Sequence, residues 1–167
     1  MKIDTTKNIL VTGGLGFVGS NLVDELISLG IKNITVIDDL SSESSSESYM
    51  RSEVRYFLAD IVDLPDMEQD LDSFDIVFHL AALARLQPSF SNPCRYFEVN
   101  SLGTFYLLDF LRRNNKDAKI VYAGSSTAFG GPLLNPYAFA KHTGEDVCRL
   151  FSKNYGMNTA VARFFNV

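Results

Sequence analysis

The chain of 167 residues has little of what would assign it to a special class. Its two cysteines, Cys94 and Cys148, show neither metal-ligand spacing nor a disulfide framework, which favours a reducing, cytoplasmic environment. No apolar run approaches the roughly 18 residues of a membrane span, and residues 1–7 lack the apolar core of a signal peptide. The 15 basic residues are outnumbered by 20 acidic ones, which disfavours nucleic-acid binding. We therefore expect a cytoplasmic protein with no metal site and with neither nucleic acid nor membrane as a partner.

What the chain does contain is a regular alternation of apolar segments. With 46% hydrophobic and 21% charged residues, the composition is ordinary for one soluble domain that buries a core. Short apolar runs predict strands at 8–12, 34–37, 54–58, 76–80, 119–123 and 159–163. Helical spacing predicts helices at 15–29, 95–113 and 137–153, with Gly30 ending the first. This order predicts an α/β fold: a Rossmann-like, doubly wound parallel sheet with helices on both faces.

A glycine-rich turn joins the first predicted strand to the first predicted helix, which is the setting of a dinucleotide-binding fingerprint. Gly13 would permit the tight turn, and Gly16 would let backbone N–H groups approach a pyrophosphate. Gly19 would let the helix pack closely, and the N-terminus of the helix would attract the phosphates. The spacing is G-x-x-G-x-x-G rather than G-x-G-x-x-G. The turn predicts a site for a dinucleotide cofactor.

Acidic residues at strand ends predict which dinucleotide would bind. Asp38 follows Gly19 by 19 residues, at the tip of the second strand, where a carboxylate accepts hydrogen bonds from adenosine ribose hydroxyls. Asp39 adds a second negative charge, and no basic residue follows before Arg51, so NAD is favoured over NADP. Asp60, after the third strand, has two interpretations. It could bind the adenine amino group, or it could cap the turn that follows it.

Residues 41–48 contain six serines and two glutamates and have nothing apolar to bury. We expect a mobile surface loop. Because this segment directly follows the second strand, the alternative is a flap over the cofactor.

Tyr137 and Lys141 are four residues apart on a predicted helix, so their side chains share one face. A phenol with a pKa of about 10 must lose roughly 3 units, or about 4 kcal/mol, to act as a base near pH 7. A cation at about 4 Å contributes an energy of that size at an effective dielectric constant near 20. Ser125, at the end of the fifth strand, could bind a substrate hydroxyl. A Y-x-x-x-K motif also occurs by chance, with the tyrosine packed and the lysine solvated. Together with the glycine turn, however, these residues predict hydride chemistry on a hydroxyl group.

Taken together, these segments resemble the extended short-chain dehydrogenase/reductase family, in its NAD-dependent epimerase/dehydratase branch, typified by UDP-glucose 4-epimerase. The resemblance covers almost the whole chain. It rests on residues 11–19, 36–41, 59–61, 79–82, 100–104, 122–126, 136–141 and 163–167.

The resemblance implies a role for each position that matches the family's motifs. Around the cofactor these are Phe17 and Val18 beneath the pyrophosphate, Asp38 on the ribose, Asp60 with Ile61 around adenine, Leu80, Ala81 and Ala82 along the nicotinamide side, Asn100 nearby, and Phe165 beside the nicotinamide. Ser125, Tyr137 and Lys141 match the catalytic residues, of which Tyr137 and Lys141 also face the cofactor. Ser126 is an alternative to Ser125, and Asn166 matches a position that contacts substrate phosphate.

By this resemblance the protein is an NAD-dependent nucleotide-sugar epimerase or dehydratase. Tyr137 would remove a proton from a sugar hydroxyl while hydride passes to NAD. The substrate would be a UDP-, GDP- or dTDP-linked sugar, and the family implies a homodimer. Two alternatives remain open at this point: a non-catalytic NAD-binding sensor or scaffold module, and an NAD-linked reductase on the same scaffold.

The chain departs from the family's pattern at three places. Phe129 replaces a tyrosine, residues 130–136 form a shorter connection than usual, and the sequence stops at Val167. These departures lead us to expect that 1–167 form an NAD-binding Rossmann domain and that the C-terminal substrate-binding region is largely absent. The two histidines receive no catalytic role: His79 is expected to pack inside the protein, and nothing is assigned to His142.

Overall fold

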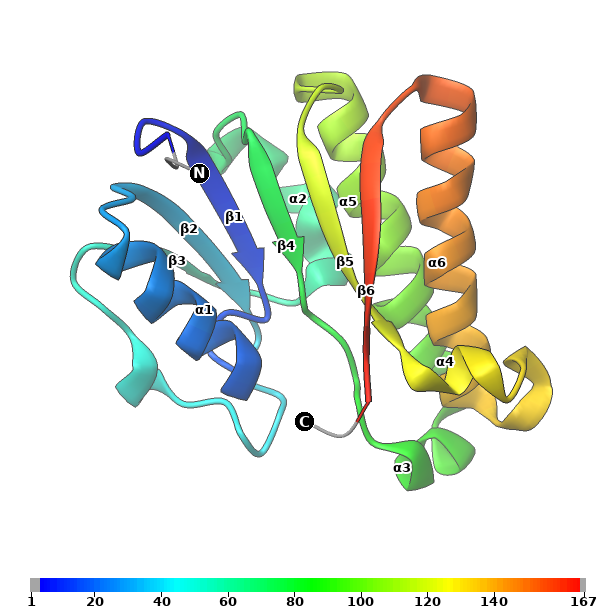
Figure 1. The fold of residues 1–167 in the computed structure, drawn as a ribbon. Coiled ribbons are helices and arrows are strands. Elements are labelled where there is room, and N and C mark those ends of the chain that lie inside the picture. The colour runs from blue at the N-terminus through cyan, green and yellow to red at the C-terminus, as the bar shows by residue number, and fades with distance from the viewer. Residues whose placement is uncertain (1–3, 166–167) are drawn as a thin grey trace.

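The structure, a computed structural model, describes residues 4–165 and contains one sheet of six parallel strands flanked by helices (Figure 1). The strands are β1 (Asn8–Thr12), β2 (Asn33–Asp38), β3 (Arg55–Leu58), β4 (Ile76–His79), β5 (Lys119–Ser125) and β6 (Asn158–Phe164). Each lies within one or two residues of its predicted position, so the strand predictions are confirmed.

The helices agree with the predictions in the long elements and differ in the short ones. They are α1 (Phe17–Ser28), α2 (Leu64–Met67), α3 (Leu86–Ser91), α4 (Pro93–Phe97), α5 (Gly103–Asn114) and α6 (Pro136–Tyr155). The single helix predicted at 95–113 is a succession of α4, a π-helical segment Glu98–Leu102, and α5. Single turns of 3₁₀ helix lie at Glu47–Tyr49, Ile61–Asp63, Glu68–Asp70, Ser126–Phe129 and Pro132–Leu134.

The strand order is β3-β2-β1-β4-β5-β6, which confirms the doubly wound Rossmann arrangement. The chain moves outward from β1 to β3, then crosses back to β4 on the other side of β1. Val11 on β1 pairs with Val36 on β2 and with Phe78 on β4. In such sheets ligands bind at the carboxyl ends of the strands, where the winding changes direction. Here that point lies between β1 and β4.

Helices cover both faces of the sheet, as expected: α1 lies on one face, and α2, α5 and α6 lie on the other (Figure 1). The core under α1 contains Val11, Val23, Leu26 and Val36, and the larger core under α5 and α6 contains residues such as Leu10 and Leu107. Alternate residues of β1 thus point to opposite faces, and both are apolar because both faces are covered.

Local signals fix the ends of α6, which carries Tyr137 and Lys141. The Asn135 side chain accepts a hydrogen bond from the backbone N–H of Ala138 at 2.8 Å, and Pro136 occupies the first helical position. Gly156, with φ of +71°, ends the helix. Gly30, with φ of +82°, similarly follows α1. No helix in residues 4–165 is both long enough and apolar enough to cross a membrane.

Candidate functional site

A cavity of about 650 Å³ lies at the carboxyl ends of the strands, and we call it the cofactor pocket. Its volume falls within the range of small-molecule and cofactor sites. The pocket brings together almost all the residues that the sequence analysis assigned to a cofactor. The predicted residues that line it are Gly13, Gly16, Phe17, Val18, Gly19, Asp38, Asp39, Asp60, Ile61, Leu80, Ala81, Ala82, Tyr137, Lys141 and Phe165.

The glycine turn has the geometry that the sequence predicted, for reasons that differ from one glycine to the next. Gly13 has φ of +72°, and a Cβ added there would lie 2.7 Å from the backbone nitrogen of Ala81. A Cβ at Gly19 would lie 2.1 Å from the carbonyl oxygen of Gly13, so the close approach made by α1 is to the turn itself. A Cβ at Gly16 would meet nothing closer than 3.5 Å. Of these three glycines, Gly16 is therefore the one where an added Cβ would make only ordinary van der Waals contacts.

The N-terminus of α1 is suited to an anion. Its N-cap, Gly16, makes no side-chain hydrogen bond to the helix, and the first turn contains no acidic residue. The first backbone N–H groups of a helix lack partners within it, and the helix dipole adds positive character there. Phe17 and Val18, the first two residues of α1, line the cofactor pocket. A phosphate could bind here without displacing a protein carboxylate.

Asp38 lines the cofactor pocket and also holds the glycine turn in place. Its Oδ2 accepts a hydrogen bond from the backbone N–H of Leu15 at 2.9 Å, and its Oδ1 accepts one from Leu40 at 2.9 Å. Burial raises the pKa of this carboxyl, while the two N–H donors oppose the rise. The bond to Leu15 was not predicted. Asp39 also lines the pocket, and it accepts hydrogen bonds from the backbone N–H and hydroxyl of Ser41.

Asp60 has the capping role that was one of its two interpretations. Its Oδ1 accepts a hydrogen bond from the backbone N–H of Val62 at 3.0 Å, and its Oδ2 pairs with Arg95 on α4. Because Asp60 also lines the cofactor pocket, the capping contact leaves the adenine interpretation open. Ile61, the next residue, is buried and borders the same pocket.

The serine-rich segment 41–48 lies against the cofactor pocket. This is the arrangement expected if the segment acts as a flap over the cofactor. Ser41, Ser42, Ser44 and Ser45 line the pocket. The backbone N–H of Ser46 donates to the carbonyl of Leu15 at 3.2 Å, which ties the segment to the glycine turn. Glu43, in the same segment, pairs with Arg85, which precedes α3. The segment is exposed to solvent, yet it forms one wall of the site.

His79 is packed inside the protein, as the sequence analysis expected. Its Nε2 lies 3.0 Å from the hydroxyl of Thr104, which donates its own hydrogen to the carbonyl of Asn100. Nε2 must therefore carry the ring proton, and Nδ1 accepts from the Thr12 hydroxyl at 2.7 Å. Burial lowers the pKa of His79 to about 3, so the ring is neutral at physiological pH. The Thr12 oxygen also accepts from the backbone N–H of Ala81, which fixes one wall of the pocket.

Asn100 is the one predicted and described cofactor residue that does not line the pocket. It is buried in the π-helical segment, where its side chain forms two hydrogen bonds with the backbone of Leu83. Leu83 does line the pocket. Asn100 thus supports the wall from behind. No local sequence signal identifies the π-helix that places it there.

Tyr137 and Lys141 face the same pocket from the first turns of α6. Lys141 is almost completely buried, and desolvation lowers the pKa of its ammonium group to about 8. Its Nζ lies 4.5 Å from the centre of the Tyr122 ring on β5, a cation–π contact. The Tyr137 ring meets Tyr96 edge to face, with centroids 6.4 Å apart. The helix thus holds a buried cation one turn from a phenol.

Ser125 lies at the end of β5, next to the pocket-lining residues Ala123 and Gly124. Its hydroxyl oxygen accepts hydrogen bonds from the backbone N–H of Thr127 at 3.2 Å and from the Thr127 hydroxyl at 3.0 Å. Neither Ser125 nor its alternative, Ser126, is among the residues that line the cofactor pocket. The Ser125 hydroxyl hydrogen is free to donate, because in both hydrogen bonds with Thr127 the Ser125 oxygen is the acceptor.

The end of β6 closes the pocket with aromatic side chains. Phe165 lines the pocket as expected, and so does Phe164, which the sequence analysis missed. Phe129, which replaces the family's tyrosine, stacks on Phe165 with centroids 6.0 Å apart. Asn166, predicted to contact substrate phosphate, lies outside the described residues.

Comparisons with known proteins agree with this geometry. The sequence profile described as the NAD dependent epimerase/dehydratase family matches residues 9–167. A putative UDP-glucose 4-epimerase from Methanocaldococcus jannaschii is 33% identical over 95% of this chain and 55% of its own length.

Solved structures give the same result. UDP-glucose 4-epimerase from Thermotoga maritima, determined with UDP-glucose, has a TM-score of 0.85 and 31% identity, covering 93% of this chain and 54% of that one. The Bordetella bronchiseptica enzyme WbmF, determined with NAD+, has a TM-score of 0.84 and 31% identity, covering 96% and 50%. This chain thus spans about half the length of the relatives it matches. It belongs to the NAD-dependent epimerase/dehydratase family of the extended short-chain dehydrogenases/reductases.

Proposed function

We propose that residues 1–167 form the NAD-binding domain of a nucleotide-sugar epimerase or dehydratase and carry its acid–base residues. One observation carries the proposal: Tyr137 and Lys141 on α6 share a pocket with the glycine turn of β1 and α1. A packed tyrosine and a solvated lysine would be the ordinary state of a chance Y-x-x-x-K pair. Here the lysine is buried and both side chains face the dinucleotide pocket.

The residues of the pocket fit NAD. The N-terminus of α1 suits the pyrophosphate, because Gly16 adds no side chain there and no side chain caps the helix. Asp38 and Asp39 suit the adenosine ribose and oppose a 2′-phosphate, and among the described residues that line the pocket only Lys141 is basic. Leu80, Ala81, Ala82 and Phe165 would border the nicotinamide. NAD, when bound, supplies a hydride acceptor for the sugar carbon.

Tyr137 is the proposed base that takes the proton of the sugar hydroxyl at its phenolic oxygen. With a pKa of about 8, Lys141 is charged in about nine of ten molecules at pH 7 and stabilises the phenolate that forms. A cation placed about 4 Å from a phenolate oxygen would contribute about 4 kcal/mol at an effective dielectric constant near 20. Ser125 orients the hydroxyl through its free hydrogen, with Ser126 as the alternative. Oxidation of the sugar carbon leaves a keto-sugar with two possible fates. In an epimerase it is reduced again from its other face, and in a dehydratase it loses water.

The proposed substrate is a nucleotide sugar linked to UDP, GDP or dTDP. UDP is favoured, because the relatives include UDP-sugar epimerases and a structure with UDP-glucose. We also propose a cytoplasmic homodimer. Phe105 on α5 is 40% exposed and packs edge to face on Phe151 of α6, so these helices present an apolar surface that a second copy could cover.

Two assays test this function in order. NAD and NADP affinities are measured first by calorimetry. NAD should bind more tightly, and tighter NADP binding would contradict the role of Asp38 and Asp39. The protein is then incubated with NAD and a panel of UDP-, GDP- and dTDP-sugars, and the products are identified by NMR. A new epimer or a keto-deoxy sugar is expected, and Tyr137→Phe should abolish its formation while keeping NAD affinity. Turnover by Tyr137→Phe at the parent rate would refute the mechanism.

A further inference from the structure

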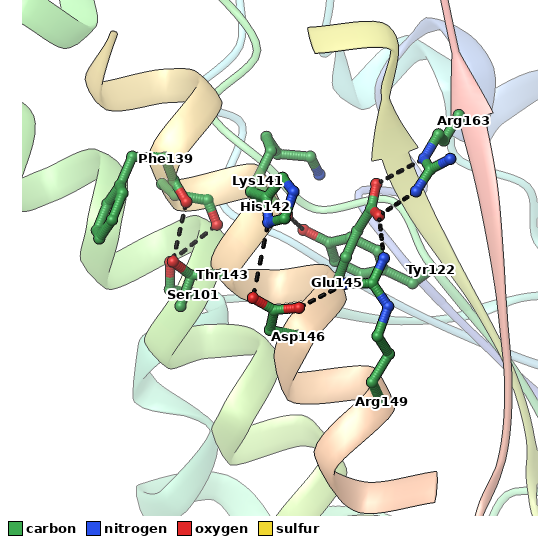
Figure 2. A network of polar contacts seen from close by, with 11 residues as sticks. Ser101, Tyr122, Phe139, Lys141, His142, Thr143, Glu145, Asp146, Arg149 and Arg163 are labelled. Atoms are coloured by element: carbon green, nitrogen blue, oxygen red, sulfur yellow. Dashed lines mark hydrogen bonds and ion pairs between the residues drawn. The ribbon is translucent and has the colours of Figure 1, made fainter. Parts of the chain in front are cut away.

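Glu145 on α6 has a buried carboxylate that plays no part in the proposed reaction. Its side chain is 1% exposed, and it follows Lys141 by one helical turn. From β6, Arg163 donates to it through Nε at 3.1 Å and through Nη2 at 2.8 Å. Arg149, one turn later on α6, adds a third hydrogen bond at 3.2 Å. Figure 2 shows the carboxylate between these two guanidinium groups.

The carboxylate also occupies space that a glycine on β5 leaves free. A Cβ at Gly124 would lie 2.7 Å from Oε1 of Glu145 and 2.6 Å from Val161 of β6. A side chain at this position would displace the side chains of Glu145 and Val161. Gly124 immediately precedes Ser125, so the carboxylate packs against the strand that carries the proposed hydroxyl-binding residue.

Glu145 therefore contacts three segments that build the site. It shares α6 with Tyr137 and Lys141, it packs on Gly124 before Ser125, and it binds Arg163 before Phe164. We propose that Glu145 is a positioning residue: its buried charge fixes these three segments to one another and supports the ammonium of Lys141. The proposal deepens the proposed function, on which its significance for catalysis rests.

The charges around Lys141 explain why a carboxylate would be placed here. Desolvation lowers the pKa of Lys141, and Cys148 and Glu145 on the same helix oppose that effect. Tyr122 faces the ammonium from β5, the neutral His79 lies on the side of β4, and Tyr137 lies one turn earlier on α6. Of these groups, Glu145 is the one paired with arginines, Arg149 and Arg163. Its negative charge helps to keep Lys141 protonated at neutral pH.

Two substitutions separate this role from simple packing. Glu145→Gln keeps the shape but removes the negative charge, so the pKa of Lys141 should fall by roughly 1 unit. Arg163→Gln removes a positive charge from the same cluster, so the pKa of Lys141 should rise. Asp146→Asn is the matched control, because Asp146 neighbours Glu145, pairs with Arg149 and is 59% exposed; it should leave the pKa unchanged. The pKa is read by NMR of ¹³C,¹⁵N-labelled lysine, with the Lys141 signal assigned by its loss in Lys141→Met.

A second readout addresses the geometry. Both Glu145→Gln and Arg163→Gln weaken the contact between α6 and β6, so both should weaken NADH binding, measured by fluorescence, whereas Asp146→Asn should not. Opposite pKa shifts with a shared loss of affinity support the proposal. Shifts of the same sign, or an unchanged Lys141 pKa, overturn it. If Glu145→Gln does not fold, Arg163→Gln decides alone: a raised pKa supports the proposal, and a lowered or unchanged one refutes it.

The outcome is distinct from that of the proposed function. The Lys141 titration needs neither cofactor nor substrate, so it remains informative if the parent chain turns over no nucleotide sugar. If the parent protein failed to bind NAD, the proposed function would be refuted. The Lys141 titration would still test the role of Glu145.

Discussion

Lys141 is expected to reduce the stability of the fold, because it places an ammonium group out of water. Its pKa falls from 10.5 to about 8, a difference of about 2.5 units. At 1.36 kcal/mol per unit, the charge lowers the free energy of unfolding by about 3 kcal/mol at pH 7.

Lys141→Met removes the charge while keeping most of the apolar side chain. We expect the variant to be about 1–3 kcal/mol more stable than the parent at pH 7, although Tyr137 loses its cation and turnover disappears. Urea unfolding gives the free energies of both proteins. Lys153→Met is the matched control: this lysine is exposed in the last turn of the same helix, and its replacement should change stability by less than about 0.5 kcal/mol.

The pH dependence of the free energy of unfolding provides the test that could refute this prediction. Between pH 8 and pH 10.5 the unfolded chain binds a proton at this lysine that the folded chain has released, so parent stability rises with pH relative to the variant. The advantage of Lys141→Met is therefore complete below pH 8 and lost above pH 10.5. A variant less stable than the parent at pH 7, or an advantage that persists at pH 11, would show that the ammonium is not desolvated.

Three further predictions follow from the pocket and its supports. Gly19→Ala should destabilise the fold by about 1–3 kcal/mol, whereas Gly16→Ala should keep parent stability and weaken NAD binding, as thermal unfolding and calorimetry would show. Asp38→Asn should cost about 1–3 kcal/mol in urea unfolding, since the amide can accept from only one of the N–H groups of Leu15 and Leu40; no loss would contradict the bracing role. Between pH 6.5 and 3 the unfolded chain protonates His79 and the folded chain does not, so this residue makes the fold less stable as the pH falls. His79→Leu should remove that part of the acid destabilisation. An unchanged dependence of stability on pH would show that His79 is accessible to protons in the folded chain.

The strands and long helices could be predicted because their signals are local. The glycines at 13 and 30 mark real changes of direction with positive φ, and apolar runs between them are long enough to show their period. The short helices α2 and α3 contain four and six residues, too few to display helical spacing. The π-helical segment Glu98–Leu102 reads as ordinary helix in sequence. Its extra residue per turn is not encoded by a local motif.

In the site, the motif residues could be predicted and the contacts between distant segments could not. The bond from Leu15 to Asp38 joins residues 23 apart, and the Arg163–Glu145 pair joins residues 18 apart. No spacing rule identifies such partners. The direction of the Asn100 side chain could not be predicted from the sequence either, because the π-helix determines it. Burial was predicted correctly for His79, where an apolar strand surrounds the residue.

The position of β6 at the margin of the sheet has a consequence for the behaviour of the chain in solution. Among the described residues its one strand neighbour is β5, so the other side of its backbone presents unpaired N–H and C=O groups. Such an edge is a template for another strand. The seven residues Asn158–Phe164 are long enough to direct pairing, and their one charged side chain, Arg163, is engaged by Glu145 on α6. Concentrated preparations of this chain should therefore associate through this edge, and a strand added there would extend the sheet directly beside the pocket.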